Sequence, residues 1–123
     1  MGLFCDDPIP AGTLIWRYEP KIDFRFTREE VEALPPAAKA FVLRFCYPVG
    51  DGWEVFEVNG DNMRFLNHSE TPNVVYGDED IVSTARDIAA GEELVSDYHG
   101  LYAPGTPAWV YEFTCASFIG PPR

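Results

Sequence analysis

The chain has 123 residues, of which 46% are hydrophobic and 15% aromatic, so it is long and apolar enough for one folded domain and is not a disordered chain. Its formal net charge of -11 repels phosphate backbones, which excludes direct nucleic-acid binding as an expected function. The same charge would attract a basic protein or peptide, although solubility is the simpler explanation of it.

The first third of the chain predicts a strand and then a helix. Residues 13–18 are rich in β-branched and aromatic side chains, which favours a strand. Thr27 followed three residues later by Glu30 forms a capping box, so we expect a helix to begin at Thr27. Pro35 and Pro36 must end or restart that helix, because proline lacks the backbone N–H.

A second helix and a second strand are expected next. Residues 37–46 predict a helix with one apolar face, formed by Ala38, Phe41, Val42 and Phe45. Residues 53–58 predict a strand that ends at the turn dipeptide Asn59-Gly60.

The second half of the chain predicts a hairpin and a repeated turn. Residues 73–76 and 81–85 should pair around an acidic turn that begins at Gly77. The sequence Ile-x-Ala-Gly occurs at residues 9–12 and again at residues 88–91, each time before a predicted strand that ends in tyrosine. Residues 100–123 contain many turn-forming residues, so we expect a loop or a docked lid there.

Residues 64–73 read Arg-Phe-Leu-Asn-His-Ser-Glu-Thr-Pro-Asn. Asn, Ser and Pro favour turns, so this stretch is a poor helix and a poor strand. Polar side chains in a rigid turn behind an apolar anchor are typical of a site. Two other interpretations stay open: a structural turn with a hydrogen-bonded histidine, and a glycan acceptor at Asn67-His68-Ser69.

Nothing in the chain signals a membrane span or secretion. The longest apolar cluster of note is residues 40–43, and the N-terminus lacks the regions of a signal peptide. We therefore expect an intracellular protein, cytoplasmic or, in a eukaryote, nuclear, with no membrane partner. Cys5, Cys46 and Cys115 are odd in number and widely spaced, which argues against a disulfide framework and a zinc site.

A second stretch, residues 85–98, ends in Gly-Glu-Glu-Leu-Val-Ser-Asp-Tyr. Together with residues 64–73 it resembles the paired signatures of the SET-domain family, R-F-x-N-H-S-x-x-P-N followed by G-E-E-L-x-x-D-Y. Residues 2–18 also resemble the opening of that family. The resemblance implies a mainly β fold of several short strands and small sheets, with one or two short helices and a threaded C-terminal segment, over a single domain of residues 1–123.

The resemblance further implies an S-adenosylmethionine-dependent protein lysine methyltransferase that acts on a basic protein or peptide and needs no metal. It assigns cofactor contacts to Asn67 and His68, with Arg64 and Phe65 shaping the same pocket. It assigns the catalytic role to Tyr98, whose phenol stays protonated at neutral pH and is better suited to orientation than to proton abstraction.

The opening of the chain departs from the family pattern. Gly2, Leu3 and Phe4 match the later part of a G-x-G-L-F pattern whose backbone meets the cofactor, because glycine permits close approach. The first glycine of that pattern and the strand before it are missing, so we expect a clipped N-terminal edge.

Two further departures concern the substrate channel and the tail. Ser96 stands where many relatives carry Phe or Tyr, and the smaller side chain predicts room for more than one methyl group. The tail has one cysteine where many relatives have three, so no zinc-binding segment is expected. Tyr111 or Phe113 could stack on adenine, although an aromatic core contact is the simpler role.

Two other functions stay open at this point. One is a non-catalytic SET-like module that binds a cofactor or a peptide. The other is a hydrolase that uses Ser69, His68 and Asp97, for which no G-x-S-x-G turn is present. The sequence does not determine the substrate protein, the target lysine, the number of methyl groups or the oligomeric state.

Overall fold

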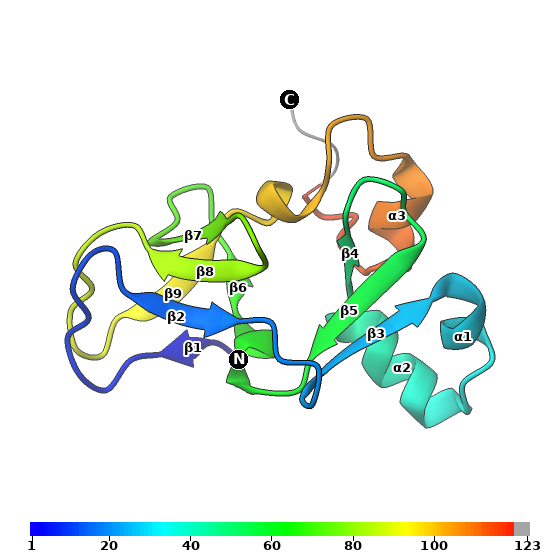
Figure 1. Cartoon of the computed structure of the whole chain (residues 1–123), viewed down its shortest axis with the longest axis horizontal. Helices are drawn as coiled ribbons and strands as arrows, with labels where there is room; N and C mark the ends of the chain where they lie inside the picture. The colour runs from blue at the N-terminus through cyan, green and yellow to red at the C-terminus, as the bar shows by residue number, and fades with distance from the viewer. Residues whose placement is uncertain (120–123) are drawn as a thin grey trace.

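Three small sheets carry the fold in the computed structural model, which describes residues 1–119 (Figure 1). Each sheet has three strands. In spatial order these are β1 (Leu3–Phe4), β9 (Glu93–Ser96) and β6 (Asn67–His68); β2 (Leu14–Arg17), β8 (Ile81–Thr84) and β7 (Val74–Gly77); and β3 (Asp23–Thr27), β5 (Val55–Asn59) and β4 (Tyr47–Val49). The helical segments of the described residues are α1 (Arg28–Glu32), α2 (Pro36–Phe45), α3 (Ala108–Phe113) and the 3-10 helices η1 (Asn62–Phe65) and η2 (Tyr98–Leu101). The predicted mainly β class is therefore confirmed.

The capping box at the start of α1 forms as predicted. The Thr27 hydroxyl accepts a hydrogen bond from the Glu30 N–H at 3.2 Å, and the Glu30 carboxylate accepts one from the Thr27 N–H at 2.9 Å. Two of the N–H groups at the helix start are thus satisfied reciprocally. Pro35 precedes α2 and Pro36 is its first residue, so the proline pair separates the two helices as expected.

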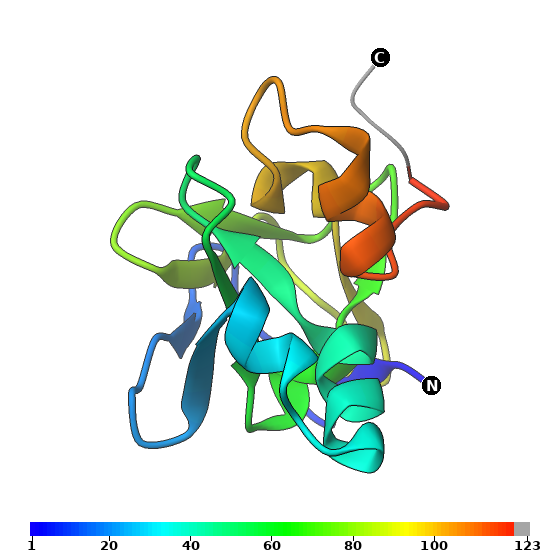
Figure 2. The same ribbon diagram turned by 90° about the vertical axis from the view of Figure 1, so that its right-hand side faces the viewer.

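The predicted apolar face of α2 is wrong in part. Val42 is buried and Phe45 packs against the core, but Ala38 is exposed and 47% of Phe41 is exposed. The helix lies beside α1 at one end of the molecule (Figure 2), so only a narrow stripe of it meets β5. That stripe continues into the buried Cys46 at the helix end.

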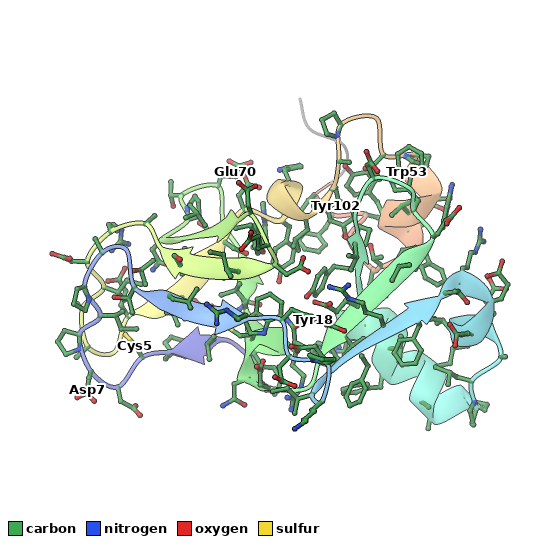
Figure 3. All side chains as sticks on the ribbon, in the orientation of Figure 1. Cys5, Asp7, Tyr18, Trp53, Glu70 and Tyr102 are labelled. Atoms are coloured by element: carbon green, nitrogen blue, oxygen red, sulfur yellow. The ribbon has the colours of Figure 1, made fainter. Side chains whose placement is uncertain are left out.

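The second predicted strand begins later than expected. Strand β5 starts at Val55, because Trp53 adopts a left-handed conformation with φ of 54°. Trp53 instead reaches toward the start of α3 (Figure 3), where its indole N–H donates to the Thr106 hydroxyl at 3.2 Å.

The predicted hairpin and the repeated turn are both present. Strands β7 and β8 pair from Val74–Thr84 to Gly77–Ile81. The two Ile-x-Ala-Gly copies face each other, since Ile9 and Ile88 exchange backbone hydrogen bonds of 2.9 and 2.8 Å. Gly12 and Gly91 then adopt matching φ angles of 77° and 82°, which glycine permits without strain.

Residues 100–119 are more regular than predicted. They hold the end of η2 and the whole of α3, and Val110 and Tyr111 of α3 are buried in the core that α1, α2 and β5 share. Apolar side chains at helical spacing outweigh the turn-forming residues around them. Residues 120–123 lie outside the described part of the chain. None of the helices in the described residues is long and apolar enough to cross a membrane.

Candidate functional site

The two sequence motifs meet in one sheet. Strand β6 runs parallel to β9, with Asn67 opposite Val95 and His68 opposite Ser96. The expectation of a turn over the whole first motif is therefore wrong at Asn67 and His68, because the neighbouring β9 supplies partners that the local sequence cannot reveal. The pairing brings residues of the first motif to within contact of Tyr98, which directly follows β9 and Asp97.

Asn73 ties the end of the first motif to β9. Its side chain is 1% exposed; the amide donates to the Glu93 carbonyl at 2.8 Å, and the amide oxygen accepts from the Val95 N–H at 2.8 Å. Its own N–H donates to the Val95 carbonyl at 3.0 Å. The final asparagine of the motif thus has a structural role.

Asn67 lies on the face of β6 that lines a cavity of about 820 Å³. Its exposed amide donates to the Met1 carbonyl and to the Glu93 carboxylate, both at 2.8 Å. Gly2 passes close by, since a Cβ at Gly2 would lie 2.5 Å from a Glu93 carboxylate oxygen. That oxygen is the end of a flexible side chain, so a larger residue at position 2 would require the Glu93 side chain to move.

Leu3 and Phe4 form β1, which pairs with Leu94 and Glu93 of β9. Leu3 packs against a core cluster that includes the buried Leu66 and Leu94, whereas 58% of Phe4 is exposed. Neither side chain is among those that line the cavity, so their contribution to the site is the backbone that β9 holds.

Arg64 and Phe65 also line the cavity, as predicted from their motif. The Arg64 guanidinium lies 4.3 Å from the centre of the Phe65 ring and donates to the Asp61 carbonyl at 2.9 Å. The Phe65 ring meets the edge of Phe45 at 6.0 Å, which brings the end of α2 to the same wall. Arg44 of α2 lines the cavity as well.

Tyr98 is held at both ends by the first motif. Its hydroxyl donates to the Leu66 carbonyl, and its N–H donates to Nδ1 of His68 at 3.0 Å. Burial, and next the Glu93 carboxylate, raise the pKa of Tyr98, so the phenol stays protonated at neutral pH. Tyr98 lines the same cavity as Asn67, so the structure brings these two predicted site residues together.

His68 lies apart from that cavity. Adjacent side chains of a strand point to opposite faces, so His68 faces away from Asn67. It borders a smaller hollow together with Ser69, Glu70, Asp97, His99 and Phe118.

The room expected beside Ser96 is occupied. Ser96 is fully buried, and its hydroxyl lies 2.6 Å from the hydroxyl of Tyr76, which lines the cavity. The Tyr76 ring comes from β7, which belongs to a different sheet and contacts β9, and its hydroxyl fills the space directly beside Ser96. The open room predicted beside a small residue at position 96 is therefore absent, and the number of methyl groups stays a prediction.

Phe113 does not lie at the cavity. Its ring packs 4.7 Å from Phe56 in the core, and Tyr111 stacks on Tyr102 at 4.5 Å. The simpler core role holds for both, and adenine stacking by Phe113 is not supported. Two other aromatic residues of the tail, Tyr102 and Phe118, line the cavity. Phe118 is 71% exposed, and its ring lies 6.2 Å from the rings of His68 and Tyr98.

A polar wall of the cavity was not predicted from the sequence. Tyr47 donates to Glu57, whose side chain is 2% exposed and accepts from Arg25 at 2.7 Å. Burial is the main cause that raises the pKa of Tyr47, followed by the charge of Glu57. Cross-strand pairing of β3, β4 and β5 assembles this wall, so no single stretch of sequence signals it.

The hydrolase alternative is not supported. The Ser69 hydroxyl accepts from the Thr71 N–H at 3.0 Å, while Nδ1 of His68 is taken by the Tyr98 N–H. His68, Asp97 and His99 have metal-ligand atoms within 4.8 Å of one another. However, Nδ1 of His68 already accepts a hydrogen bond, and Nδ1 of His99 lies 2.9 Å from Asp97, so these atoms are engaged within the protein.

Comparison with known proteins agrees with this geometry. The SET domain family profile matches residues 1–99, so the chain belongs to the SET-domain family. A comparison with curated proteins gave no match.

Solved structures share the fold at low sequence identity. The chain is similar to a humanized mutant of the Chaetomium thermophilum Polycomb Repressive Complex 2 bound to the inhibitor GSK126, with 20% identity, 79% of this chain covered and a TM-score of 0.57. It is also similar to apo ctPRC2 in an autoinhibited state, with 18% identity, 83% of this chain covered and a TM-score of 0.62. A third similar structure is ctPRC2 in an autoinhibited conformation bound to S-adenosylmethionine, with 18% identity, 79% of this chain covered and a TM-score of 0.56. The chain spans 13 to 14% of the length of these chains.

Proposed function

We propose that this protein is an S-adenosylmethionine-dependent protein lysine methyltransferase. The observation that carries the proposal is the cavity that joins Asn67 and Arg64 of the first motif to Tyr98 of the second. S-adenosylmethionine would supply a methyl group on a sulfonium, which an amine can displace directly. Such a displacement asks the protein mainly for positioning in a shaped, dry channel.

The residues around Asn67 fit the polar groups of this cofactor. Arg44 and Arg64 both line the cavity, in a protein with only 9 basic residues against 20 acidic ones. A guanidinium fork matches a carboxylate such as that of the methionine moiety. Asn67 offers both donor and acceptor atoms, and the backbone at Met1 and Gly2 lies beside it.

The residues around Tyr98 fit a lysine side chain. The rings of Tyr47, Tyr76 and Tyr98 line the cavity, and each hydroxyl already has a hydrogen-bond partner that fixes its ring. An aliphatic stem can pack between such rings, and burial favours the neutral amine that the reaction requires. Because the Tyr98 hydroxyl donates to Leu66, its oxygen lone pairs remain for orienting the amine.

The charge of the protein supports a basic substrate. The net charge of -11 would speed the approach of a Lys-rich segment, and Asp80, in the turn between β7 and β8, lines the cavity. These negative charges fit a basic protein or peptide as the partner.

Isothermal calorimetry with S-adenosylmethionine tests the proposal. We expect saturable heat for the wild-type protein and weaker binding for Asn67→Ala. Asn62→Ala is the matched control, because Asn62 is exposed on η1 and is not among the residues that line the cavity. Absence of heat from the folded wild-type protein would overturn the enzyme proposal and leave a peptide-binding module.

A further inference from the structure

The histidine of the first motif contacts the backbone of Tyr98 instead of the cavity. The His68 side chain is 15% exposed, and its Nδ1 accepts the Tyr98 N–H at 3.0 Å. Two residues earlier, the Leu66 carbonyl accepts the Tyr98 hydroxyl. The segment from Leu66 to His68 therefore holds Tyr98 at its backbone and at its phenol.

This hydrogen bond defines the protonation state of the imidazole. Nδ1 can accept an N–H only while it carries no proton, so the neutral ring bears its proton on Nε2. A protonated ring would point an N–H at the Tyr98 N–H and lose the bond. The Asp97 carboxylate lies 3.8 Å from the same Nδ1 and would then attract it.

We propose that His68 is a positioning residue for Tyr98, acting through this hydrogen bond, and that its side chain is not a cofactor contact. The inference rests on the proposed function, because it concerns how Tyr98 is held for methyl transfer. It predicts that His68 sets the turnover rate, and that cofactor affinity depends on Asn67, on the opposite face of β6.

Few charged groups face His68 in the described residues. Asp97 and His99 come from the segment after β9, and Glu70 follows β6 at the rim of the same hollow. Asp97 also accepts from the His99 N–H at 3.0 Å and lies 2.9 Å from its Nδ1. This carboxylate is therefore engaged by His99, and the Tyr98 N–H is the hydrogen-bond donor to Nδ1 of His68.

Two substitutions separate positioning from cofactor contact. His68→Leu removes the acceptor, and we expect kcat to fall about tenfold, or about 1.4 kcal/mol, while the calorimetric Kd for S-adenosylmethionine changes little. His68→Asn places an amide oxygen near the position of Nδ1, so it should restore most of kcat. A raised Kd with unchanged kcat in His68→Leu would overturn the proposal.

A second readout does not depend on activity. In the cofactor-free protein, the ¹⁵N–¹H signal of Tyr98 should have the downfield ¹H shift of a hydrogen-bonded amide, move upfield in His68→Leu and stay near its wild-type position in His68→Asn. His99→Gln should leave the Tyr98 signal in place, since His99 does not contact that N–H. A Tyr98 signal that does not move in His68→Leu would refute the inference, even if methyl transfer is confirmed. Conversely, failure of S-adenosylmethionine to bind would refute the proposed function while this comparison still reports on His68.

Discussion

The two asparagines of the first motif should separate stability from binding. Asn73→Ala removes two hydrogen bonds of 2.8 Å from a side chain that is 1% exposed, and it leaves the Glu93 carbonyl and the Val95 N–H without their partner. Each unsatisfied buried group costs about 1–3 kcal/mol, so the free energy of unfolding should fall by about 3 kcal/mol. That is a large share of the about 5–15 kcal/mol typical of a domain.

Urea denaturation followed by circular dichroism measures this difference. With an m-value of about 1–3 kcal/mol/M, the midpoint should fall by about 1–3 M at unchanged slope. Asn67→Ala is the comparison: its side chain is exposed, so stability should change by less than about 0.5 kcal/mol while cofactor affinity falls. Equal destabilisation by the two substitutions, or none by Asn73→Ala, would refute this division of roles.

Three further predictions concern pH, thiols and product. The Arg86 guanidinium donates a hydrogen bond of 2.5 Å to the Glu92 carboxylate. This bond is the largest cause that lowers the pKa of Glu92 from 4.5 to about 2. The ionised Glu92 therefore stabilises the fold fully above pH 4.5, and this contribution disappears as the pH falls through about 2. Glu92→Gln should be less stable than wild type at pH 7 in thermal unfolding, and the gap should close between pH 4.5 and 2; a gap independent of pH would contradict this. Burial, and next the charge of Cys115, raise the pKa of Cys46 to about 12, whereas Cys115 is exposed. A thiol reagent should therefore label Cys115 before Cys46, as measured by mass spectrometry. Fast labelling of Cys46 would contradict this prediction. Tyr76→Phe removes a hydroxyl and frees room for about one water molecule. If the proposed function holds, mass spectrometry of the product should then show more methyl groups per lysine. An unchanged product would count against the view that Tyr76 limits the number of methyl groups.

Local signals explain what the sequence could predict. The capping box at Thr27 and the hairpin around Gly77 depend on residues within a few positions of each other, and both form as expected. The family signatures identified the stretches that hold Asn67 and Tyr98, because their residue types and order are specific. The contact between Ile9 and Ile88 was visible as a repeated sequence, although not as a pair.

Long-range packing explains what the sequence could not predict. The two-residue strand at Asn67 and His68 exists only because β9 lies beside it, and the strand geometry then turns His68 away from the cavity. The space beside Ser96 is filled from β7, which the spacing of the second motif does not report. In the tail, helix α3 directs Phe113 into the core and leaves Phe118 at the site, a choice that depends on where the helix ends.

Transfer of a radiolabelled methyl group from S-adenosylmethionine to mixed basic proteins tests the central claim most directly. The account predicts labelled methyllysine with the wild-type protein and about 100-fold less with Tyr98→Phe, because that substitution removes the hydroxyl that the Leu66 carbonyl positions. Tyr18→Phe is the matched control, since the Tyr18 ring packs under Arg25 at 3.9 Å and Tyr18 is not among the residues that line the cavity. Equal labelling by wild type and Tyr98→Phe, or label on residues other than lysine, would contradict the account.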